Sequence, residues 1–123
     1  MASTLKFDKQ EARMVRWLAV DGIHQAKKSA TQLWSDEMQR LEPVVMSLKP
    51  GEPLRLERFS LMVLDVVVNT GLHENARMLE SERLSDDRPA IASARMKISR
   101  AISDVSLQRS GVSKLPLPSG GRG

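Results

Sequence analysis

Apolar residues are densest between Leu54 and Leu72, where they fall on every side of the segment whichever period is assumed. Such segments are normally covered on most sides by the rest of the protein. The β-branched residues of 63–68 favour a strand. However, no second convincing strand is available, and an unpaired strand would leave its backbone groups without partners. The leucines recur at mostly helical spacing, so we predict a buried central helix with a stop at 69–71.

A second apolar pattern, with steps of three and four residues, runs through the N-terminal third of the chain. Asp8 and Glu11 precede it in the arrangement of a capping box, and their charges suit the start of a helix. Pro43 follows the last apolar position, Leu41. We therefore predict one long helix from about Lys9 to Leu41. Its face is rich in Ala and Gly, which allows another helix to approach closely.

The C-terminal half predicts two further helices. Residues 73–84 form a short acidic segment with a thin apolar face, and residues 89–108 carry a clean apolar stripe that begins at Pro89 after two aspartates. The chain from 110 onward is rich in Gly, Pro and Ser, which is typical of a flexible tail. The fold class is thus all-α. A small helical bundle spans residues 1–109 behind a frayed lead-in at 1–7, and a basic tail spans 110–123.

Composition narrows the class of protein. A chain of 123 residues suits one domain. The absence of Cys excludes disulfides, thiolate metal ligands and cysteine nucleophiles. No apolar run is long enough for a transmembrane helix, and the N-terminus lacks the apolar core of a signal peptide. We expect a cytoplasmic protein, or one packaged within a virus particle, that does not contact a membrane.

Few residues suggest catalysis or ligand binding. The two histidines, His24 and His73, lie outside any recognisable motif, and no serine sits in a nucleophile-elbow pattern. No spacing typical of metal ligands and no glycine-rich phosphate loop occurs. The sequence therefore predicts no enzyme, no cofactor, no metal site and no small-molecule substrate.

Two residues of the predicted long helix lie away from its apolar stripe. Trp17 falls nearly opposite Val15, and Val20 is also well off the stripe. The commoner interpretation is a second buried side against a neighbouring helix. The functional one is an exposed patch that binds a partner or a second copy of the chain. We predict a non-catalytic protein-interaction module, such as an adaptor, inhibitor or assembly factor, with Trp17 and Val20 as its contact residues.

The charge distribution supports an alternative function, nucleic-acid binding. The net charge is +4, and residues 89–123 alone carry six basic residues against one acidic residue. A basic end on a nearly neutral body suits nucleic acid or an acidic partner. No aromatic residues are interleaved with these cations, which argues against stacking on single strands. The predicted phosphate contacts are Arg95, Lys97, Arg100, Arg109, Lys114 and Arg122.

A helix-turn-helix centred on residues 69–71 is a further nucleic-acid hypothesis. Its second helix would have to face phosphates in the major groove. The segment after Gly71 is mainly acidic, with Arg77 as its one basic residue before Arg83. Acidic side chains are repelled by the polyanion, so the sequence favours the C-terminal segment over this arrangement.

Overall fold

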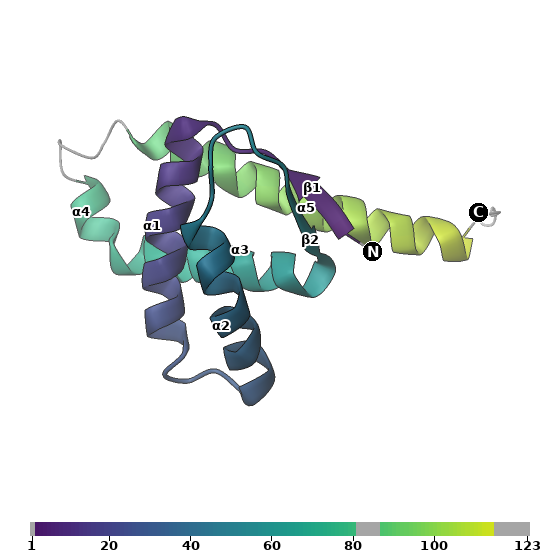
Figure 1. The fold of residues 1–123 in the computed structure, drawn as a ribbon, viewed down its shortest axis with the longest axis horizontal. Helices are drawn as coiled ribbons and strands as arrows, with labels where there is room; N and C mark the ends of the chain where they lie inside the picture. The colour runs from purple at the N-terminus through teal and green to yellow at the C-terminus, as the bar shows by residue number, and fades with distance from the viewer. Residues whose placement is uncertain (1, 81–86, 115–123) are drawn as a thin grey trace.

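The computed structural model describes residues 2–80 and 87–114. The chain is mostly helical, as predicted, with one small antiparallel sheet (Figure 1). Among the described residues, no helix is long and apolar enough to cross a membrane. The elements are β1 (Ala2–Leu5), α1 (Lys9–Ala26), α2 (Gln32–Met46), β2 (Leu54–Glu57), α3 (Arg58–Glu74), α4 (Ala76–Glu80) and α5 (Arg88–Lys114).

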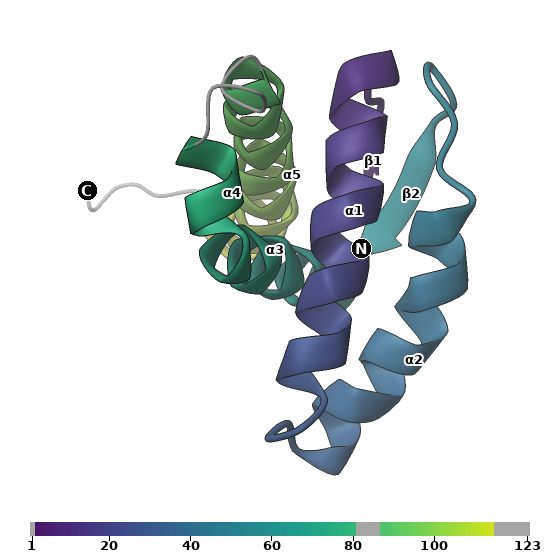
Figure 2. The same cartoon turned by 90° about the vertical axis from the view of Figure 1, so that its left-hand side faces the viewer.

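The helices form two layers that cross steeply. Helices α1 and α2 lie side by side in one layer, and α3 and α5 run across them in the other (Figures 1 and 2). Helix α3 packs against α1, α2 and α5 and is buried along most of its length. This agrees with the central buried helix expected from the sequence. The buried apolar residues of α3 are Leu61, Val63, Leu64, Val67 and Val68.

The two strands are a correction to the predicted fold. Residues 2–5, expected to be frayed, pair with the start of the predicted central helix, with Ala2 opposite Glu57 and Leu5 opposite Leu54. Leu5 and Leu56 are buried, so each strand contributes to the core. Strands of four residues are too short to show a clear alternation in sequence, and their pairing partners lie far apart along the chain.

The prediction of a single long N-terminal helix is also wrong. The predicted capping box is present, with Glu11 N donating to Asp8 Oδ1 at 2.7 Å and Asp8 N donating to Glu11 Oε1 at 2.8 Å. However, α1 ends at Ala26, the chain reverses, and α2 begins after Thr31, whose side chain caps it. Leu33, whose spacing fits the apolar pattern of a continuous helix, is 66% exposed. Helix α2 instead buries its own apolar residues, Met38, Leu41 and Val45.

Two glycines allow α1 and α3 to cross in close contact. A Cβ atom on Gly22 would lie 1.7 Å from the carbonyl oxygen of Val67, and one on Gly71 would lie 1.9 Å from that of Leu18. The Ala- and Gly-rich face therefore receives a helix, as expected. Gly71 is not a helix stop, because α3 continues to Glu74. The hypothesis of a helix-turn-helix centred on 69–71 is therefore wrong, because these residues lie within α3.

Of the two C-terminal helices, α5 has the predicted apolar stripe, and α4 differs from the prediction in where it begins. The acidic helix predicted over 73–84 begins later than expected, because residues 73–74 still belong to α3 and α4 starts at Ala76. Helix α4 has five residues, and residues 81–84 of the prediction lie outside the described residues. Helix α5 runs to Lys114, beyond the predicted end at Gln108, while residues 115–123 of the predicted tail lie outside the described residues. β1 lies along α5 (Figure 1). The buried stripe of α5 is Ile91, Ala94, Ile98, Ala101 and Val105.

Candidate protein-interaction surface

Trp17 and Val20 both lie half-buried on α1, where they pack against the core but keep part of their surface in solvent. Beside them, at the end of α2, the side chain of Met46 is 61% exposed. These apolar side chains line a shallow hollow of about 360 Å³. We call it the Trp17 hollow, and its residues are Arg13, Arg16, Trp17, Val20, Asp21 and Met46.

The charged side chains of the Trp17 hollow are held in place from outside it. Each makes a hydrogen bond to a residue on a different part of the chain. The bonds join Arg13 to Asp87 (2.9 Å), Arg16 to the carbonyl oxygen of Leu48 (2.8 Å) and Asn75 to Asp21 (3.0 Å). These bonds fix the charged edge around the apolar centre before a partner binds. The edge therefore loses little conformational freedom on binding.

The residue types of the Trp17 hollow are those enriched in protein interfaces. Interfaces favour Trp, Met and Arg, with apolar side chains at the centre and polar ones at the edge. Trp17 and Met46 come from different helices and line the same hollow because α2 folds back along α1. Neither of the two interpretations of Trp17 is sufficient alone, since it contacts the core on one side and solvent on the other.

The predicted phosphate contacts on α5 differ in exposure. Arg95 and Arg100 are exposed, but Lys97 is half-buried, with Nζ 2.6 Å from Glu11 Oε1. Lys97 also donates to the carbonyl oxygen of Lys6 at 2.9 Å. Its charge is therefore already matched by a carboxylate. Of the others, Arg109 and Lys114 lie in the last turns of α5, and Arg122 lies outside the described residues.

Glu11 is a buried carboxylate that the sequence suggested only as a helix cap. It is 1% exposed and accepts hydrogen bonds from the Ser93 hydroxyl, the Lys97 ammonium and the Asp8 amide. Burial raises the pKa of Glu11, but the hydrogen bonds from Lys97, Ser93 and Asp8 outweigh it, so the pKa is lowered overall. Glu11 thereby joins α1 to α5.

A second buried carboxylate, Glu37, accepts from Arg40 at 2.7 Å and from Ser60 at 2.6 Å, and so joins α2 to α3. Among residues 2–80 and 87–114, no group of three or more His, Cys, Asp or Glu side chains is placed to hold a metal ion. Glu11 and Glu37 both have protein partners, which indicates a structural role for each.

Comparison with protein-family models, with curated proteins and with solved structures finds no match to this chain. No function is therefore transferred from a known protein. The functional argument depends on the geometry of the described surfaces, and above all on the Trp17 hollow.

Proposed function

We propose that this chain is a non-catalytic protein-interaction module, acting as an adaptor, inhibitor or assembly factor. It binds another protein, or a second copy of itself, through the Trp17 hollow. One observation carries the proposal: Trp17, Val20 and Met46 form an apolar centre whose charged edge is already fixed by hydrogen bonds to other elements.

The energetics favour an apolar side chain from the partner entering the hollow. Covering apolar surface contributes roughly 25 cal/mol per Å². Association also costs translational and rotational freedom and the ordering of side chains. The ordering cost is small here because Arg13 and Arg16 are held before binding. Trp17 is the anchor, since large aromatic residues at the centre of an interface contribute most to affinity.

The Met46→Lys variant should weaken association at least tenfold. Met46 is 61% exposed, so a lysine there places a charge at the centre of the hollow without entering the core. Met96→Lys is the matched control, because Met96 is 54% exposed on α5. The measurement is light scattering for self-association and a pull-down from the native host for a partner, at low and high salt. Equal association of Met46→Lys and Met96→Lys would contradict the proposal.

Trp17→Ala tests the anchor itself. We expect association to be lost while the variant stays folded. Trp34→Ala is the control, because Trp34 is also half-buried, with its ring 5.5 Å from that of Phe59 and away from the hollow. Circular dichroism reports folding of both variants. If Trp17→Ala unfolds and Trp34→Ala does not, Trp17 is a core residue, and the Met46 comparison alone decides.

Nucleic-acid binding through α5 is the second candidate function. Arg95 and Arg100 support it, since both are exposed and neither forms an ion pair with another described residue. Arg95→Gln combined with Arg100→Gln should then weaken binding to a DNA or RNA duplex about tenfold and flatten its salt dependence. Filter binding across a salt series measures both. Unchanged affinity in the double variant would exclude this mode.

A further inference from the structure

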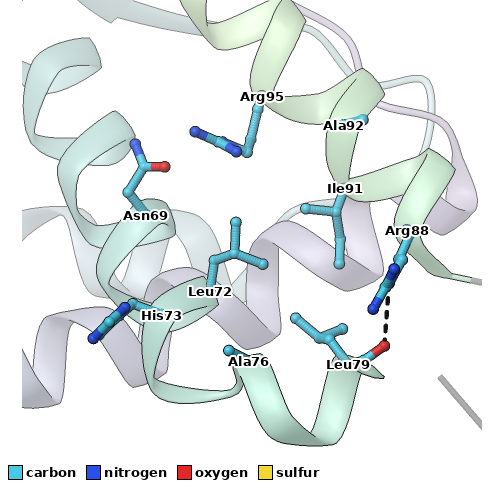
Figure 3. Close-up of a pocket in the computed structure, with 9 residues that line it drawn as sticks. All are labelled: Asn69, Leu72, His73, Ala76, Leu79, Arg88, Ile91, Ala92 and Arg95. Carbon is cyan, nitrogen blue, oxygen red and sulfur yellow. Dashed lines mark hydrogen bonds between the residues drawn. The ribbon is translucent and has the colours of Figure 1, made fainter. Parts of the chain in front are cut away.

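A second hollow lies between α3, α4 and α5 and has a volume of about 520 Å³ (Figure 3). Its inner surface is apolar and is formed chiefly by Leu72, Leu79 and Ile91. Leu79 and Ile91 are 4% and 5% exposed, so the apolar floor is part of the folded core. We call this the α3–α4–α5 pocket. Its volume falls within the range of small-molecule sites, about 300–1,000 Å³.

The edge of the α3–α4–α5 pocket is polar and carries positive charge. Arg88 and Arg95 both line it, from positions two helical turns apart on α5, and no described lining residue is acidic. Arg88 Nε donates to the carbonyl oxygen of Leu79 at 3.3 Å, which fixes its side chain at one end. Arg95 extends across the opening toward Asn69 (Figure 3).

Asn69 completes this edge with an oriented amide. Its Nδ2 donates to the backbone oxygen of Asp65 at 2.9 Å, which settles which way the amide group faces. The Asn69 side-chain oxygen then faces the Arg95 guanidinium (Figure 3). Arg95 and Asn69 thus lie on the same edge of the pocket (Figure 3), and the Arg95 guanidinium offers paired N–H donors suited to a carboxylate.

We propose that the α3–α4–α5 pocket binds an amphipathic organic anion, with its carboxylate beside Arg95 and its apolar body on Leu72, Leu79 and Ile91. The apolar floor and the positively charged edge together select an amphipathic anion. A simple anion such as phosphate leaves the apolar floor in water, while a neutral apolar molecule leaves the positive charge of the two arginines unmatched. This site is independent of the Trp17 hollow, so either proposal can fail without the other.

Octanoate is the test ligand, titrated into the full chain and followed by calorimetry and by amide NMR shifts. We expect saturable binding of octanoate that is at least tenfold tighter than that of 1-octanol or inorganic phosphate, with shifts at Leu72 and Ile91. Equal affinity for octanol, equal affinity for phosphate, or no saturable octanoate binding would each overturn the proposal.

Three substitutions locate the bound anion. Arg95→Gln should weaken octanoate binding about tenfold, whereas Arg100→Gln, at an exposed position of the same helix outside the pocket, should leave it unchanged. Ala92→Phe should abolish binding by filling the opening, and since Ala92 is exposed the variant should remain folded. Equal affinities for Arg95→Gln and Arg100→Gln would overturn the proposal, as would retained binding in a folded Ala92→Phe protein.

Discussion

Replacing Gly71 by Ala should unfold the protein or cost at least about 4 kcal/mol of unfolding free energy, an effect reached by few single substitutions. The added Cβ would lie 1.9 Å from the carbonyl oxygen of Leu18, which is backbone and cannot rotate away. Helices α1 and α3 would have to separate, and the apolar core between them would lose its packing. Gly22→Ala should behave alike, since its Cβ would lie 1.7 Å from the carbonyl oxygen of Val67.

Helix propensity makes the opposite prediction, so the sign of the effect is informative. Ala is more favourable than Gly inside a helix by about 1 kcal/mol. Gly51→Ala is the control: it makes the same chemical change at a loop position with nothing within 4 Å, and should cost only about 1–2 kcal/mol because its φ is +75°. Urea unfolding followed by circular dichroism measures all three variants. A Gly71→Ala protein as stable as the parent would contradict the close crossing.

For Gly71→Ala, helix propensity predicts a gain in stability and the packing of α1 on α3 predicts a loss. This difference shows which features can be predicted from local sequence and which cannot. Periodicity and capping are local signals, and they identified the helical class, the buried α3, the Asp8–Glu11 cap and the stripe of α5. A glycine near the end of a helical pattern usually ends the helix. Here it lies inside α3 because α1 passes over it, and that contact is not visible in the local sequence.

The same distinction applies to the reversal between α1 and α2 and to the sites. The apolar pattern continued through residues 27–31, and only the packing of α2 against α1 shows that the chain turns there. Trp17 could be singled out because its angle on one helix is a local property. Met46 could not, since it lines the same hollow from another helix. The α3–α4–α5 pocket combines three elements and likewise had no local signal.

Lys97→Met should cost about 3 kcal/mol of unfolding free energy at neutral pH, near the lower end for breaking a buried ion pair. The side chain of Lys97 is 39% exposed, but that of its partner Glu11 is only 2% exposed. Removing the lysine therefore leaves a carboxylate in the interior without its countercharge. Glu11→Gln should cost less, because the remaining lysine can turn toward water. Lys9→Met, at an exposed position of α1, is the control and should have little effect.

The pH dependence of this loss identifies Glu11 as its source. In the parent protein the pKa of Glu11 is lowered, so its contribution to stability is complete above the ordinary value of 4.5 and is lost as the pH falls through the lowered pKa. Without Lys97, burial is opposed by fewer hydrogen bonds and the pKa of Glu11 rises relative to the parent. The unpaired carboxylate of Glu11 then takes up a proton at a higher pH, and the loss of stability caused by Lys97→Met should become smaller as the pH falls.

Urea unfolding of the parent, Lys97→Met and Lys9→Met proteins between neutral pH and about pH 4 measures this difference. A penalty that stays constant across the series would mean that Lys97 stabilises the fold through its hydrogen bond to the carbonyl oxygen of Lys6 rather than through the charge of Glu11.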